Sequence, residues 1–199
     1  MRYVTVLLAA LVAVAYSPAT AVAADKYMID HPHTNVGFSV KHMVITSVKG
    51  KFNEFDGTIM FDETDLTKTS ASGIIKAASI DTGNEKRDTH LKSDEFFGVE
   101  KFPDIAFQSK KVIKRDEGYV MVGDITIRGV TKEIEIPFEI VGKITDPMGD
   151  TRIGIHAGAR INRQDFGVSW SKALEGGGLI VGNDVTIELD IEAVKAKEE

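Results

Sequence analysis

The chain has 199 residues, and its 24 Lys and Arg against 30 Asp and Glu give a formal net charge of −6. This acidic balance argues against binding to nucleic acid and against docking on an anionic membrane face, because both present negative phosphates. The chain has no cysteine, so no disulfide framework supports the fold, which must rest on the burial of apolar side chains.

The first residues predict a cleaved Sec-type signal peptide, from residue 1 to about residue 24. Arg2 supplies a positive charge, residues 3–16 are almost wholly apolar, and Ala21-Val22-Ala23 forms a small-x-small cleavage site. The apolar run is shorter than the roughly 20 residues that a spanning helix needs, and no second such run follows. We therefore expect an exported, periplasmic protein that does not span the membrane. Its mature domain, residues 25–199, has a charge of 23 − 30 = −7.

The mature chain alternates apolar and polar residues with a period of two, which is typical of strands with one buried face. The clearest case is residues 132–144, where apolar Ile134, Ile136, Phe138, Ile140 and Ile144 alternate with charged Glu133, Glu135, Glu139 and Lys143. In chain order, we expect strands at residues 27–30, 35–42, 51–62, 72–81, 105–112, 119–128, 132–144, 152–162 and 185–193.

Residues 84–100 break the alternation, and their charged and apolar residues predict one or two short helices. Elsewhere short turns such as Asp116-Glu117-Gly118 join successive strands, which must then be antiparallel. Eight amphipathic strands, or nine with residues 27–30, can pack as a two-sheet sandwich or close into a barrel. Closure removes exposed edges, so we expect an all-β, single-domain, eight-stranded antiparallel barrel with a helical insert.

A barrel of eight strands either fills its interior with side chains or leaves a cavity for one small ligand. Its apolar rows contain the small residues Ala78, Gly123, Gly142, Ala157, Ala159 and Ala193, which would leave volume inside. They could equally ease a taper or a bulge, so the sequence pattern leaves both alternatives open.

The residues also resemble a known family over about residues 27–194. The matching stretches include Phe38-x-Val40-x-His42, Gly50-Lys51-Phe52, Arg87-Asp88-x-His90-Leu91-Lys92-Ser93, Phe102-Pro103-x-Ile105-x-Phe107, Thr126-Ile127-Arg128-Gly129 and Ile161-Asn162-Arg163-x-Asp165-Phe166-Gly167. In order and spacing they are similar to the YceI-like, lipid or polyisoprenoid-binding family. The resemblance implies a lipocalin-like barrel, a periplasmic location and an isoprenoid-type lipid, such as a quinone or a polyprenyl phosphate, as the ligand in a central tunnel.

On this basis we expect the inward apolar residues to contact lipid. They are Phe38, Val40, Phe61, Ile74, Phe107, Met121, Ile125, Ile134, Ile136, Phe138, Ile155, Phe166 and Trp170. Arg87, His90 and Arg163 are candidates for holding a lipid head group, since arginine presents donors suited to phosphate. The alternative is that a helix starts here, with Asp81, Thr82 or Asn84 as its cap and Arg87 paired locally. For Arg163, the alternative is an ion pair in the Arg163-Gln164-Asp165 segment that fixes a turn.

Other site chemistries have weaker support. Among the five histidines only His31 and His33 are close in sequence, and a proline separates them, so no metal site is predicted. Motifs for a catalytic nucleophile or a zinc protease are missing, and Gly176-Gly177-Gly178 is not followed by the Lys-Ser/Thr of a phosphate-binding loop. No cofactor other than the bound lipid is expected.

The leading hypothesis is therefore a non-enzymatic lipid carrier or reservoir. The alternatives are an enzyme that acts on an isoprenoid inside the barrel, and a ligand-free structural or stress-response barrel. The sequence leaves the oligomeric state open, including a homodimer.

Overall fold

The computed structural model of the protein describes residues 24–197, so the predicted signal peptide lies almost wholly outside the described residues. The described part contains one α-helix, α1 (Glu85–Lys92), and the 3₁₀ helices η1 (His31–His33), η2 (Leu66–Lys68), η3 (Ala77–Ser79) and η4 (Arg163–Phe166). Its strands are β1 (Asp25–Ile29), β2 (Asn35–His42), β3 (Thr46–Phe52), β4 (Phe55–Phe61), β5 (Ser70–Lys76), β6 (Ile80–Asp81), β7 (Asp104–Arg115), β8 (Gly118–Ile127), β9 (Val130–Thr145), β10 (Thr151–Asn162) and β11 (Val181–Lys195). None of the helices between residues 24 and 197 is long and apolar enough to cross a membrane.

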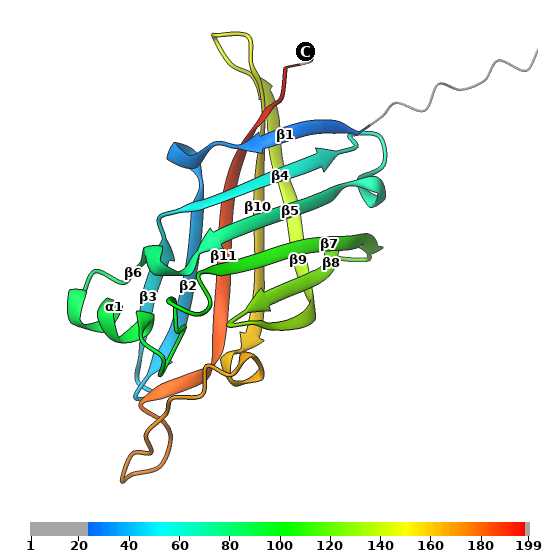
Figure 1. Ribbon diagram of the computed structural model, residues 1–199. Helices are drawn as coiled ribbons and strands as arrows, with labels where there is room; N and C mark the ends of the chain where they lie inside the picture. The colour runs from blue at the N-terminus through cyan, green and yellow to red at the C-terminus, as the bar shows by residue number, and fades with distance from the viewer. Residues whose placement is uncertain (1–23, 198–199) are drawn as a thin grey trace, which may run out of the picture.

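Eight of these strands close into a barrel (Figure 1), in the order β1-β4-β5-β7-β8-β9-β10-β11. Every pairing is antiparallel, and the ring closes where Ile29 of β1 lies opposite Ala193 of β11. The structure thus confirms the predicted all-β, lipocalin-like barrel. Its closure leaves no free edge within the ring.

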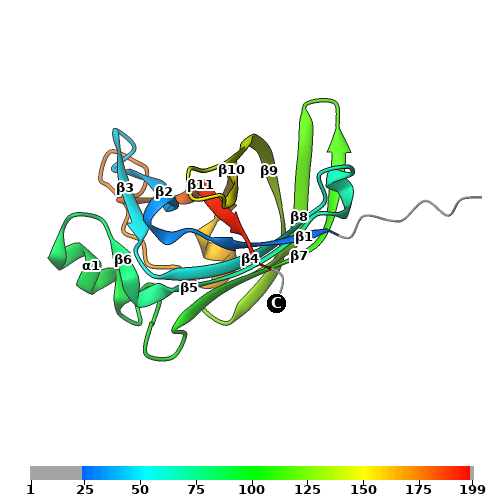
Figure 2. The same ribbon diagram turned by 90° about the horizontal axis from the view of Figure 1, so that it is seen from above.

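The remaining strands, β2, β3 and β6, form a side sheet that branches from β11. The first part of β11 pairs with β2 up to Asp190, and its last part pairs with β1 from Ala193. Figure 2 shows the side sheet and α1 together on one side of the barrel. The side sheet therefore widens the wall of the barrel next to the predicted helical insert.

Two predicted strands are not continuous. The expected strand at residues 51–62 divides into β3 and β4 at Asn53 and Glu54, and the one at residues 72–81 divides into β5 and β6 around η3. At the breaks, the Asn53 N–H donates to the Ser79 carbonyl at 3.2 Å, and the Lys76 N–H donates to the Glu54 carbonyl at 2.9 Å. The two bends lie side by side, and they direct β3 and β6 away from the ring.

One predicted side-chain orientation is wrong because β9 contains an irregularity. Gly154 lies opposite Gly142 but Ile155 lies opposite Ile140, so Val141 is an extra residue in β9. An extra residue reverses the alternation beyond it. Ile144, expected to point inward, is consequently 62% exposed.

The apolar interior consists of two clusters. One lies beside the side sheet and the insert, with Phe52, Ile80, Phe96 and Phe166 among its buried members. The other surrounds Tyr27 of β1. The insert forms a helix as predicted, capped by the Asn84 side chain, which accepts from the Arg87 N–H.

Candidate functional site

The barrel encloses an apolar cavity of about 300 Å³, the lower end of the size range of ligand pockets. Side chains from the ring and from the side sheet line it, and most of them are aliphatic or phenylalanine. Both core clusters contribute, for example through Phe52 and Ile59. An interior of this kind favours an apolar ligand, whose burial is worth about 0.8 kcal/mol per CH₂ group.

Eleven of the thirteen residues predicted to contact lipid lie on the wall of this cavity. They are Phe38, Val40, Ile74, Phe107, Met121, Ile125, Ile134, Ile136, Phe138, Ile155 and Phe166. Alternation accounts for those in the regular strands, because side chains at every second position share one face of a sheet. Phe166 is an exception, since it lies in the 3₁₀ helix η4.

Three of the thirteen residues were expected to point into the cavity but lie differently. Phe61 does not line the cavity but packs edge-on against Tyr27, with ring centroids 5.8 Å apart. Trp170 lines a second, smaller cavity. Ile74 borders the main cavity, yet its side chain is 48% exposed, and its neighbour Ile75 packs on the core instead.

Several wall residues were missed by the sequence reasoning. Val185, Ile187 and Leu189 of β11 line the cavity, and the clear alternation of that strand was sufficient to identify them. Phe96 and Phe97 of the insert also line it, and no periodic pattern marks them because they lie in turns. Only the packing of the insert on the side sheet brings them to the wall.

The small residues named from the sequence have different roles. Ala157 lies on the cavity wall and is 7% exposed, and Gly123 is buried beneath the Phe107 ring. A Cβ atom at Gly123 would lie only 2.6 Å from that ring, so a glycine is needed for the close approach. Ala193 is buried beside Tyr27 instead, whereas Ala78 and Gly142 are exposed and leave no volume inside.

Arg163 is a charged residue on the wall of the main cavity, and it is 5% exposed. Its Nε donates to the Gly182 carbonyl at 2.8 Å, its Nη1 to the Val168 carbonyl, and its Nη2 to the Val181 carbonyl at 3.2 Å. Burial lowers the pKa of this guanidinium. These contacts tie η4 to the start of β11. Arg163 thus fixes a turn, as the alternative expected, but through backbone carbonyls and not through the expected ion pair.

The other two head-group candidates, Arg87 and His90, line the second cavity of about 190 Å³ together with Trp170. Arg87 donates through Nε to the Thr82 hydroxyl at 2.7 Å and through Nη2 to the Thr82 carbonyl at 2.8 Å. His90 packs edge-on against Trp170, with ring centroids 5.2 Å apart. Arg87 is thus paired locally, as the alternative interpretation expected, while it also borders a cavity.

The two cavities are neighbours. Their walls have five residues in common, namely Phe38, Val40, Leu91, Phe96 and Val181. A lipid tail in the larger cavity and a polar group in the smaller one would therefore both contact these five residues.

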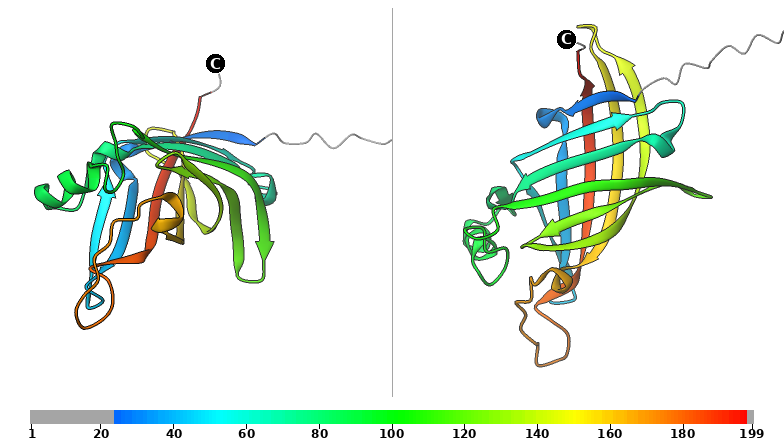
Figure 3. Two further views of the ribbon diagram at one scale, coloured as in Figure 1. Left: turned by 60° about the horizontal axis from the view of Figure 1, so that its bottom comes forward. Right: turned by 45° about the vertical axis from the view of Figure 1, so that its right-hand side comes forward.

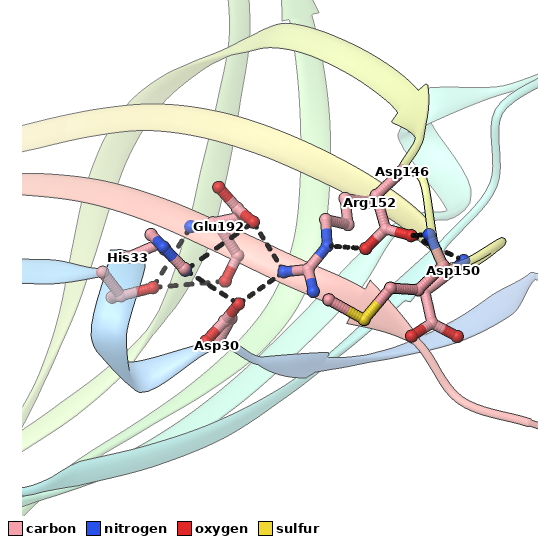
Figure 4. Close-up of polar contacts among 8 residues, drawn as sticks. Asp30, His33, Asp146, Asp150, Arg152 and Glu192 are labelled. Atoms are coloured by element: carbon pink, nitrogen blue, oxygen red, sulfur yellow. Dashed lines mark hydrogen bonds and ion pairs between the residues drawn. The ribbon is translucent and has the colours of Figure 1, made fainter.

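A polar cluster lies where β11 changes partner from β2 to β1 (Figure 4), and we call it the seam cluster. It consists of Asp30, His33, Asp146, Arg152 and Glu192. The Arg152 guanidinium donates to Asp146 and to Glu192, each at 2.7 Å, and also to Asp30. Hydrogen bonds from His33 and Arg152 lower the pKa of Asp30, and the bond from Arg152 lowers the pKa of Asp146.

Within the seam cluster, Asp30, His33 and Glu192 bring three potential metal-ligand atoms within 4.8 Å of one another. Two of these groups, Asp30 and Glu192, are carboxylates that already accept hydrogen bonds from the Arg152 guanidinium. The arrangement is that of an ion-pair cluster that joins β1, β11 and the β9–β10 hairpin.

Comparison with known proteins agrees with the observed fold. The YceI-like domain profile matches residues 27–193. A UPF0312 protein of Staphylococcus aureus (strain N315) is 36% identical over 167 residues, covering 83% of this chain and 95% of its own.

Two solved structures are similar in shape. The crystal structure of a Campylobacter jejuni YCEI protein has a TM-score of 0.68 and 33% identity, and the match covers 79% of this chain and 90% of the other. A polyisoprenoid-binding domain from Saccharophagus degradans, implicated in plant cell wall breakdown, has a TM-score of 0.63 and 11% identity, with 87% and 99% covered. The second likeness concerns the fold alone. With the profile spanning nearly the whole described barrel, the chain belongs to the YceI-like family.

Proposed function

We propose that the protein is a non-enzymatic carrier or reservoir that holds a long apolar lipid of the isoprenoid type inside its barrel. The observation that carries this proposal is the apolar cavity of about 300 Å³, which the side chains of a closed barrel leave unfilled. The S. degradans structure that shares this fold is named a polyisoprenoid-binding domain, which supports the same ligand class. Export to the periplasm is part of the proposal, and it rests on the signal peptide predicted from the sequence.

The test begins with the native lipid. The protein is purified from its host under mild conditions, and its organic extract is analysed by mass spectrometry. The delipidated protein is then titrated with a long polyprenol in dilute detergent while its melting temperature is recorded. A ligand that binds only the folded state at 100 times its Kd adds about 2.7 kcal/mol of stability, which for a chain of this size is a rise of roughly 5 to 10 °C.

The proposal fails if no apolar molecule co-purifies and the polyprenol leaves the melting temperature unchanged. The same samples test the enzyme alternative. A carrier returns the polyprenol chemically intact after long incubation, whereas an isomerase or cyclase would convert it to a product that chromatography separates.

A further inference from the structure

The hairpin that joins β2 to β3 ends in three consecutive apolar residues that face solvent. Met43 is 40% exposed, Val44 is 63% exposed and Ile45 is 86% exposed. Met43 and Val44 have φ angles of 49° and 65°, in the left-handed region that glycine and asparagine adopt far more readily. Burial within the chain and turn geometry therefore both fail to explain why apolar residues occupy this tip.

The tip lies at the rim of the second cavity. Val40, His42 and Val48, from the two strands of the hairpin, line that cavity. The Met43 N–H donates to the Ile180 carbonyl at 2.8 Å, so the tip is fixed to residues 171–180, the loop before β11. Both Figure 1 and Figure 3 show this hairpin and this loop together at one end of the barrel, opposite the β9–β10 hairpin.

The charge of the hairpin segment differs from that of the whole chain. Residues 31–53 contain no Asp or Glu but include Lys41, Lys49 and Lys51, in a chain whose net charge is −6. Across the hairpin, Lys41 lies opposite Ser47 and Lys49 lies opposite Ser39. Neither lysine has an ion-pair partner among residues 24–197, whereas Lys76, Lys101, Lys110 and Lys143 each have at least one. The argument from net charge against an anionic membrane therefore does not apply to this hairpin.

We propose that this end of the barrel docks on a lipid bilayer that contains anionic lipids. Met43, Val44 and Ile45 enter the interfacial layer, and Lys41 and Lys49 face the lipid phosphates. The cavity rim then lies at the membrane surface, where a lipid can pass between bilayer and barrel. The passage of lipid rests on the proposed function. The docking itself is inferred from the composition, exposure and position of the hairpin.

The experiment is flotation of the purified protein with phosphatidylcholine vesicles, with and without phosphatidylglycerol. The test variant carries Met43→Asn, Val44→Gly and Ile45→Thr. Asparagine followed by glycine suits a turn with two left-handed residues, so this variant should fold at least as stably as the wild type. The matched control is Met148→Ser, because Met148 is also 86% exposed but lies on the β9–β10 hairpin at the opposite end.

We expect the wild type and the Met148→Ser control to float with anionic vesicles, and the test variant to partition roughly tenfold more weakly because it has lost its apolar contact area. Lys41→Gln with Lys49→Gln should weaken binding to anionic vesicles only, and added salt should reduce the difference. The proposal is overturned if the wild type does not float, or if the test variant floats as well as the wild type.

Two further readouts separate this inference from its rivals. Sedimentation velocity of the same proteins shows whether the apolar tip instead joins two copies of the chain, which would also overturn the proposal. The polyprenol melting shift in detergent is measured on every variant. If the test variant no longer floats but keeps the normal melting shift with polyprenol, the result supports docking through the tip. If the wild type floats but polyprenol does not shift its melting temperature, only the proposed cavity function is contradicted.

Discussion

The hydroxyl of Tyr27 is the most unusual group of the second core cluster. The side chain is fully buried, with 0% exposure, and packs edge-on against Phe61. Its hydroxyl oxygen has no hydrogen-bond partner within residues 24–197, and burial raises the pKa of the phenol, so it stays neutral. A buried donor left without a partner costs about 1–3 kcal/mol.

Replacing Tyr27 with phenylalanine should therefore leave the free energy of unfolding unchanged or raise it by about 1 kcal/mol, because the ring is kept and only the unpartnered hydroxyl is removed. Urea denaturation followed by circular dichroism measures the difference. A loss of more than about 1 kcal/mol would contradict the prediction and indicate a buried water that satisfies the hydroxyl.

For single residues, the sequence predicts well which side chains point into the barrel wherever alternation is regular, and poorly where it is not. Ile134 lies between the charged residues Glu133 and Glu135 and is placed correctly on the cavity wall. Ile74 and Ile75 are adjacent apolar residues, so alternation cannot say which one points inward. Ile144 follows the pattern of its strand but lies beyond the extra residue Val141, which only the pairing with β10 reveals.

Among the elements, the seam cluster joins the parts of the chain that close the barrel. Arg152 of β10 contacts Asp30 after β1, Asp146 in the β9–β10 hairpin and Glu192 of β11. The pKa values of Asp30 and Asp146 are lowered, so their contribution to stability is present above the unfolded aspartate pKa of about 3.9. It is lost as the pH falls through their lower folded values.

Arg152→Met should consequently destabilise the protein most at neutral pH, where three carboxylates would face one another without a cation. At about pH 4 and below, the carboxylates of the variant take up protons and the difference from the wild type should shrink. Thermal unfolding of both proteins at a series of pH values measures the difference in stability. Arg115→Met is the control, because its ion pair with Glu135 is about half exposed and should contribute little at any pH. An Arg152→Met effect that does not change with pH would show that packing, not charge, holds the seam.

Most strands could be predicted from alternation, yet the seam and the bends could not. The bends at Asn53 and Ser79 exist because the two segments bond each other across 26 residues of chain. A local pattern carries no information on such contacts. The same is true of Asp30 and Arg152, which are far apart in the sequence and meet only when the ring closes.

For the whole molecule, the main question is whether the interior is a functional cavity or simply an imperfectly filled core. Both have apolar walls, so the wall residues alone do not decide between them. The two differ in what happens when the space is filled. Extra atoms in an unwanted void improve packing without cost, whereas extra atoms in a ligand site compete with the ligand.

Ala157→Leu tests this difference, because Ala157 lies on the cavity wall opposite Phe138 of β9. We expect the ligand-free variant to be as stable as the wild type or more stable, since the added groups are buried at about 0.8 kcal/mol each in space that already exists. The melting shift caused by polyprenol should fall by at least half. Ala106→Leu, on β7 and outside the cavity wall, should keep the full shift. A stabilised Ala157→Leu variant with an undiminished shift would place the lipid elsewhere, and the barrel interior would then be a core and not a binding site.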